Sequence, residues 1–203
     1  MSKPDAETIS GIVTLAGTAS SFFTLIALHL LPTGLSPLRN AVSQYGITRF
    51  RAGYRLQTMS MGVAAIAAAI GIREVGSAGG TLIVALLVVC GAARLAISWF
   101  PMDPPDSEPT ETGRRHGLLA IAAFATTAIA AIRLGEILDR AEVWRRVSGA
   151  VTGLGYGMAV ALIALGASRR TESFRGYFGL VERAFYAGAI AFFAIVGVQL
   201  LQH

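Results

Sequence analysis

Six apolar runs, each long enough to cross a lipid bilayer, follow one another through the 203 residues of this chain. They cover Ile9–Leu31, Leu56–Ile72, Gly80–Phe100, His116–Leu134, Val147–Ser168 and Gly179–Leu201. At a helical rise of 1.5 Å per residue the first run would be about 34 Å long, which exceeds the ~30 Å hydrocarbon core of a membrane. The pattern predicts an all-α, polytopic bundle of six transmembrane helices, with residues 1–203 forming a single membrane domain.

The composition agrees with a membrane protein and argues against a nucleic-acid-binding protein. Charged residues make up 14% of the chain, whereas soluble domains have about 25%. The 17 basic residues, all arginines except Lys3, are distributed over every connection, which suits anionic lipid headgroups rather than nucleic acid. The single cysteine, Cys90, excludes an internal disulfide and a thiolate metal cluster. We expect a multi-pass protein of the bacterial plasma (inner) membrane, with membrane lipids as partners and no nucleic acid.

The most polar connection, Trp99–Gly117, contains four carboxylates, four prolines and the sequence Arg114-Arg115-His116. With six crossings, the first, third and fifth connections share one membrane face, and both termini share the other. The unusual polar residues all fall on the first of these faces, which we call the site face. They are His29, Arg39, Asn40, Ser43, Arg94, Asp103, His116, Glu182 and Arg183. We expect the bundle to gather them into one pocket, and the positive-inside rule predicts that this face is cytoplasmic.

Two further local patterns predict structure. Ser36-Pro37 is a helix start signal, and the apolar spacing that follows predicts a short amphipathic interfacial helix over Pro37–Tyr45. In the fifth run, Gly149, Gly153 and Gly157 repeat every four residues. Such a ridge lets a neighbouring backbone approach closely, so we expect this helix to sit inside the bundle.

Several passages resemble the DUF998 family of six-helix bacterial and archaeal membrane proteins, whose function is not established. They are HLLPTGLSPLRNAVSQYG, FPMD, TETGRRH and GLVER, and they span most of the chain. The positions that match the family pattern are Pro37, Arg39, Ser43, Tyr45, Phe100, Pro101, Asp103, Thr110, Gly113 and His116. Many relatives carry an acid where this chain has Ser36 or Gln44. A fainter similarity to Frag/DRAM-type membrane proteins favours lipids as ligands.

The gathered polar residues predict a site for an anionic amphiphile such as a phospholipid or polyprenyl phosphate. Arg39 and Arg94 would hold the anion, because guanidinium binds phosphate through two parallel hydrogen bonds. His116, Asp103 and Ser43 are the candidates for proton-transfer or nucleophilic chemistry. Tyr45, Glu182 and Arg183 are the further candidates for ligand binding. No cofactor is required by this interpretation.

Other interpretations remain open. A membrane-embedded hydrolase could use Ser43 with His116 and Asp103, or a zinc ion held by His29, Asp103, His116 and Glu182. The protein could instead be a small transporter or a structural scaffold. Arg94 lies about six residues inside its run, so it either faces the bundle, which would mark function, or extends toward the headgroups. Glu182 could pair with Arg94 or Arg183.

Overall fold

The computed structural model describes residues 5–75, 80–138, 144–168, 171 and 176–202, and within these ranges every regular element is a helix. The six long helices are α1 Ala6–Leu30, α2 Arg51–Val75, α3 Gly80–Ala96, α4 Glu111–Leu138, α5 Arg145–Ser168 and α7 Phe178–Gln202. Two short 3₁₀ helices accompany them, η1 Val42–Ile47 and η2 Ile97–Trp99, and η2 extends α3. All six long helices are long and apolar enough to cross a membrane, so the predicted six-span bundle is confirmed.

Two helices begin about one turn before the apolar runs that predicted them. α2 starts at Arg51 and α4 starts at Glu111, so their first turns carry charged side chains. Arg51, Arg55, Arg114 and Arg115 are all exposed. Charged residues in these turns belong to the headgroup region, where a helix continues although its hydropathy falls.

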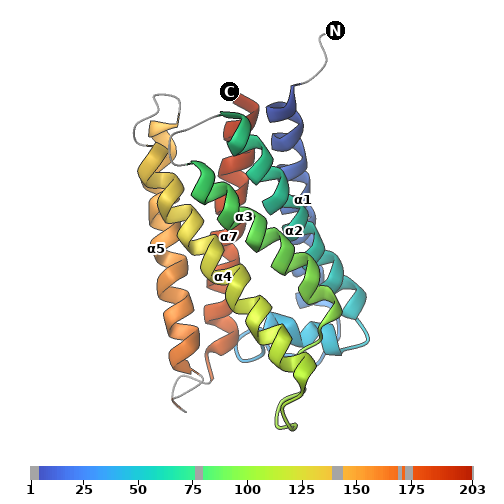
Figure 1. The fold of residues 1–203 in the computed structure, drawn as a ribbon. Helices are drawn as coiled ribbons and strands as arrows, with labels where there is room; N and C mark the ends of the chain where they lie inside the picture. The colour runs from blue at the N-terminus through green and yellow to red at the C-terminus, as the bar shows by residue number, and fades with distance from the viewer. Residues whose placement is uncertain (1–4, 76–79, 139–143, 169–170, 172–175, 203) are drawn as a thin grey trace.

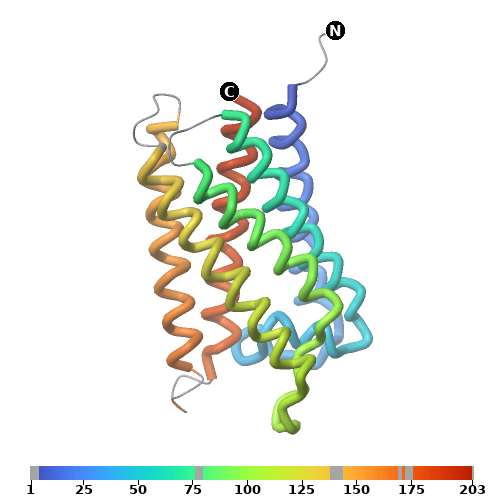
Figure 2. The backbone as a smooth tube through the Cα atoms, in the orientation of Figure 1, coloured from blue at the N-terminus to red at the C-terminus, as the bar shows by residue number. Residues whose placement is uncertain are grey.

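The helices form a ring that α7 closes. Each helix packs against its neighbour in sequence from α1 to α5, and α7 packs against both α5 and α1. α7 also contacts α2 and α4, so it lies more centrally than the others, as Figure 1 shows. Both termini lie at one end of the bundle, and η1 and the connection before α4 lie at the other end (Figures 1 and 2). The first and third connections therefore share a face, as expected.

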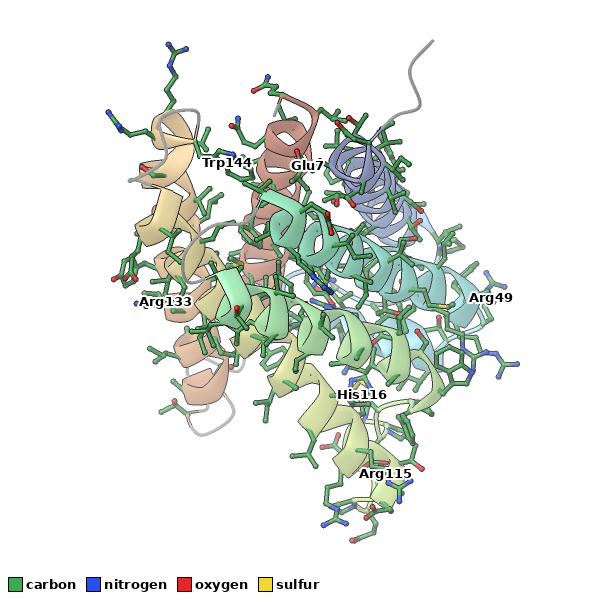
Figure 3. The ribbon with its side chains drawn as sticks, turned by 45° about the horizontal axis from the view of Figure 1, so that its top comes forward. Glu7, Arg49, Arg115, His116, Arg133 and Trp144 are labelled. Carbon is green, nitrogen blue, oxygen red and sulfur yellow. The ribbon has the colours of Figure 1, made fainter. Side chains whose placement is uncertain are left out.

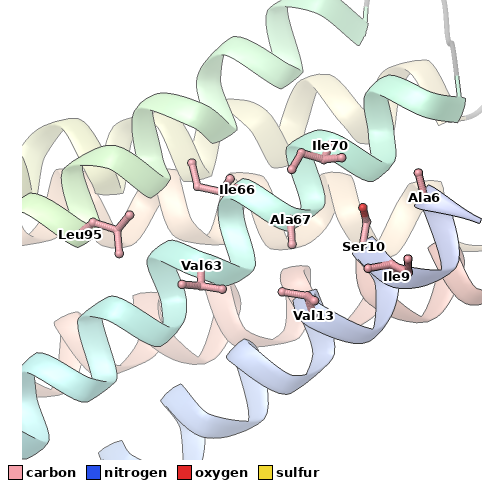
Figure 4. A pocket seen from close by; sticks show the side chains of 9 residues that line it. All are labelled: Ala6, Ile9, Ser10, Val13, Val63, Ile66, Ala67, Ile70 and Leu95. Carbon is pink, nitrogen blue, oxygen red and sulfur yellow. The ribbon is translucent and has the colours of Figure 1, made fainter.

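The lipid-facing surface is rich in large apolar side chains. Ile163 and Val160 on α5, Phe23 on α1 and Ile121 on α4 are all more than half exposed. Exposure of such side chains is expected where hydrocarbon replaces water around the bundle. An apolar groove of about 420 Å³ lies between α1 and α2, with Leu95 of α3 at one end and Ala6 at the other (Figure 4).

The short helix after the first span differs in type and position from the prediction. It is a 3₁₀ helix that begins at Val42, and residues 37–40 form a turn instead of helix. The Asn40 side chain accepts a hydrogen bond from the Ser36 N–H (2.8 Å) and donates one to Gln44 (2.5 Å). Such local side-chain bonds compete with helical ones. Val42 and Tyr45 are fully buried, so η1 packs into the end of the bundle.

The expectation for the glycine ridge of α5 is wrong. A Cβ atom added at Gly149, Gly153 or Gly157 would meet open space. The helix instead approaches α4 at Gly155, where an added Cβ would lie 2.7 Å from the Ile132 backbone nitrogen. Two residues along a helix correspond to a rotation of roughly 200°, so the ridge and Gly155 lie on opposite sides of α5.

Candidate functional site

Arg94 is directed into the bundle near the site-face end of α3 and is only 2% exposed. Its Nη1 donates a hydrogen bond to the Tyr186 hydroxyl (2.8 Å). Its Cζ lies 5.0 Å from the ring centroid of Phe124 and 4.9 Å from that of Tyr186. Phe124 in turn stacks on Phe185 at 4.3 Å. Of the two alternatives for this arginine, the structure shows the one in which it faces the bundle interior.

The Arg94 guanidinium is only partly satisfied by the protein. Its Nε is buried and has no hydrogen-bond partner within the described part of the chain. Favourable contact with the aromatic rings offsets part of the cost of burying the cation. A buried N–H on a charged group is nevertheless costly when it has no acceptor. Arg94 Nε is therefore an unsatisfied hydrogen-bond donor within the site.

Three more polar side chains complete what we call the interior polar cluster: Tyr54, Tyr186 and Glu182 join Arg94. Tyr54 of α2 is 4% exposed, and its hydroxyl lies in the electrostatic field of the other three. Glu182 of α7 is 6% exposed and accepts a hydrogen bond from the Val42 N–H (2.6 Å). The cluster thus brings together α2, α3 and α7 with η1 packed against its end.

A second group of contacts surrounds Arg183, one residue after Glu182. Its guanidinium donates to the Asn40 carbonyl (2.8 Å), to the Tyr45 hydroxyl (3.3 Å) and to His29 Nε2. These partners come from the first connection and from the end of α1. The structure therefore brings His29, Asn40, Tyr45 and Arg183 into contact, and three of these, His29, Asn40 and Arg183, belong to the set that we expected to gather.

Hydrogen bonds join the two motifs at the ends of the third connection, FPMD and TETGRRH. Asp103 accepts hydrogen bonds from the Thr110 N–H (3.0 Å) and hydroxyl (2.6 Å). Gly113 lies beneath this carboxylate, because a Cβ there would come within 1.9 Å of Asp103 Oδ2. His116 Nδ1 bonds the Phe100 carbonyl (2.8 Å). The motif spacing thus has a structural explanation.

His116 is buried, whereas its neighbour Arg115 is exposed and pairs with Glu111 (3.0 Å). Figure 3 shows His116 directed toward the bundle and Arg115 directed away from it. Such a change from an exposed to a buried side chain between neighbouring residues is expected where a helix begins at the membrane–water interface. His116 belongs to the protein interior and Arg115 to the headgroup region.

The contact between Ser43 and Met102 joins the first and third connections. The Ser43 hydroxyl donates to the Met102 sulfur at 3.1 Å. Arg39, in contrast, is exposed, whereas Arg94 is buried. The site face therefore has an interior part, around Arg94, and a surface part, around Arg39.

The residues proposed for hydrolysis have separate hydrogen-bond partners. Ser43 donates to Met102, His116 Nδ1 bonds the Phe100 carbonyl and Asp103 accepts from Thr110, so each of the three has a hydrogen-bond partner outside the trio. Within the described ranges, no three His, Cys, Asp or Glu side chains are close enough to hold a metal ion. The four residues considered for zinc are thus not assembled into a zinc site in this arrangement.

Hydrogen bonding makes Asp103 the basis of a pH prediction. The two bonds from Thr110, more than the attraction of His116, lower the pKa of Asp103 below its ordinary value of 3.8. Because the pKa is lower in the folded state, this contribution to stability is present above pH 3.8 and is lost as the pH falls through the folded-state value. We expect the Thr110 amide to be protected from exchange at neutral pH and unprotected in stronger acid. Asp103→Asn should reduce that protection at neutral pH, whereas Asp106→Asn, at an exposed position, should not.

Sequence reasoning missed Tyr54, Phe124 and Tyr186, which surround Arg94. Tyr186 follows Glu182 by four residues and so shares its helix face, a signal that the sequence contained. Phe124 carried no signal, since one aromatic residue in an apolar run looks like any other.

Comparison with known protein families gives a match over most of the chain. The family model described as "Protein of unknown function (DUF998)" matches residues 15–199. No curated protein and no solved structure matches the chain. Since the match covers most of the chain and reaches into all six long helices, the chain belongs to the DUF998 family.

Proposed function

We propose that this protein binds an anionic amphiphile, with the headgroup at the interior polar cluster and the chain in the bilayer. The observation that carries the proposal is the buried Arg94, whose Nε has no acceptor among the described residues. Ionisable residues inside membrane helices are costly and generally functional. A phosphate oxygen is the strong acceptor that such a guanidinium lacks, as in a phospholipid or a polyprenyl phosphate.

The groove between α1 and α2 supports an amphiphile over a soluble anion. One end of the groove is Leu95, the residue after Arg94, and Gly62 approaches both residues closely. The groove then follows Val63 and Ile70 toward Ala6 at the opposite end of the bundle (Figure 4). A chain lying there would run through the hydrocarbon layer, starting beside the headgroup. The inner membrane remains the proposed location, and the exposed arginines of the site face would attract anionic lipids to it.

The test is mass spectrometry of the lipids that remain on gently purified protein. We expect an anionic lipid in stoichiometric amount on the wild type and a loss of about tenfold or more in Arg94→Gln, because a charge-assisted bond is worth about 1.5–3 kcal/mol. Arg133→Gln is the matched control, since Arg133 is exposed on α4 (Figure 3). It pairs with Glu136 (2.6 Å). Equal lipid occupancy in wild type and Arg94→Gln would contradict the proposal, as would a wild type that retains only neutral lipids.

A further inference from the structure

Residues 36–47, which we call the plug segment, close the site-face end of the bundle. η1 lies at the end opposite the termini and contacts both α2 and α7 (Figure 1). Val42 and Tyr45 are fully buried. A Cβ atom at Gly46 would come within 2.7 Å of the Tyr54 ring, so the segment packs directly on the interior polar cluster. A ligand entering from this face would have to displace it.

α7 holds the plug segment through backbone and side-chain hydrogen bonds. The Leu180 N–H donates to the Leu38 carbonyl (3.0 Å), and the Val42 N–H donates to Glu182 (2.6 Å). Gly179 permits the close approach, since a Cβ there would lie 2.6 Å from two carbonyl oxygens of the segment. The amides of Val42 and Leu180 therefore report directly on whether the segment is docked.

Arg183 makes the third set of contacts between α7 and the plug segment, and the orientation of its guanidinium depends on His29. Its two terminal nitrogens reach the Asn40 carbonyl and the Tyr45 hydroxyl, both in the plug segment. Its Nε donates to His29 Nε2 at the end of α1. His29 thus fixes the orientation of the guanidinium that binds the segment.

The hydrogen bonds of His29 define its protonation state. Nδ1 contacts the Leu25 carbonyl (2.5 Å), and a carbonyl can only accept, so Nδ1 carries the hydrogen. A guanidinium can only donate, so Nε2 must present its lone pair to Arg183. His29 is therefore neutral in this arrangement. A proton on Nε2 would remove the acceptor and place two cations in contact.

We infer that His29 and Arg183 form a proton-operated latch, which keeps the plug segment docked while His29 is neutral and releases it when His29 is protonated. From η1, the Tyr45 ring faces His29 edge-on at 5.7 Å. From α7, Arg183 is the charged group that acts on it, and the adjacent Glu182 is bonded to Val42. On α2, Tyr54 lies in the interior polar cluster and Arg51 and Arg55 are exposed.

The latch itself stands on these contacts alone; its role as a gate for an anionic amphiphile rests on the proposed function. Histidine is the side chain whose charge changes most readily on mild acidification, so its residue type suits a proton-operated latch. Acidification on the site face would then give the ligand access to Arg94. Neutral pH would enclose the ligand or keep it out.

The experiment measures amide exchange at Val42 and Leu180 in lipid nanodiscs between about pH 8 and about pH 4.5, corrected for intrinsic exchange rates. These limits lie on either side of the ~6.5 typical of histidine. In the wild type we expect exchange about tenfold faster at the acid end, the factor expected from losing one charge-assisted bond. His29→Gln should remove this pH dependence. His116→Gln, which leaves His29 and Arg183 intact, should retain it.

Corrected exchange that does not change with pH in the wild type would overturn the latch, and so would an unchanged pH dependence in His29→Gln. Should His29→Gln fail to fold, Arg183→Gln serves instead, with fast exchange expected at both pH limits. Exchange as slow as in the wild type at neutral pH would then contradict the inference. Lipid retention by Arg94→Gln is measured separately, so failure of the proposed ligand and failure of the latch give different results.

Discussion

Gly155→Leu is expected to lower the free energy of unfolding of the bundle by about 1–3 kcal/mol or more, since overpacking usually costs this much. Gly155 of α5 lies against the Ile132 backbone of α4, where an added Cβ would be 2.7 Å from the nitrogen and 3.1 Å from Cα. Backbone atoms cannot rotate away as a side chain can, so α4 and α5 would have to separate. Thermal unfolding in mild detergent measures the effect as a lower midpoint.

Gly153→Leu, two residues earlier on the same helix, is the matched control. A Cβ at Gly153 meets nothing within 4 Å, and the residue is exposed. Helix propensity then favours the substitution by up to about 1 kcal/mol, so we expect an unchanged or higher midpoint. A fall as large as that for Gly155→Leu would mean that the ridge of Gly149, Gly153 and Gly157 is covered after all.

The two glycine patterns of α5 show what sequence periodicity can and cannot predict. Spacing groups Gly149, Gly153 and Gly157 on one side of the helix, and that inference about their shared face is correct. Which side meets the bundle depends on the neighbours, and in a membrane both sides are apolar. The hydrophobic contrast that orients a helix in a soluble protein is therefore weak here.

The topology could be predicted because charge interrupts hydropathy sharply in this chain. Six apolar runs fixed the number of spans, and the alternating direction of the crossings placed the first, third and fifth connections on one face. The helix starts at Arg51 and Glu111 could not be placed, since charged turns continue a helix beyond the hydrocarbon. The short helix after the first span was predicted at the wrong residues because Asn40 competes for local hydrogen bonds.

The charged residues of the candidate site could be predicted from the sequence, but the groups to which they bond could not. Arg94, Glu182 and Arg183 were noticeable because each lies in or beside an apolar run. Their contacts are with Tyr186, with the Val42 N–H and with the Asn40 carbonyl. Every residue except proline has the same backbone donor and acceptor, so a sequence does not indicate which backbone group a side chain will bond. A structural role for Asp103 and His116 likewise became visible only when their loop partners were placed.

Glu182→Leu is expected to destabilise the site-face end of the bundle by about 1–3 kcal/mol, because it leaves the buried Val42 N–H without its acceptor. Exchange at the Val42 amide should rise correspondingly. Glu182→Gln retains a side-chain oxygen in the same place and loses only the charge, so it should lose less stability, by roughly the difference between a charge-assisted and a neutral hydrogen bond.

The comparison of these two variants distinguishes the hydrogen bond that Glu182 accepts from Val42 from the effect of the negative charge of Glu182. If Glu182 acts mainly by accepting from Val42, then the glutamine variant lies between wild type and leucine. If its charge also balances the buried Arg94 in the interior polar cluster, then glutamine and leucine cost nearly the same, because either leaves a buried cation uncompensated. A leucine variant as stable as the wild type, with the Val42 amide still protected, would show that Glu182 does not hold the plug segment.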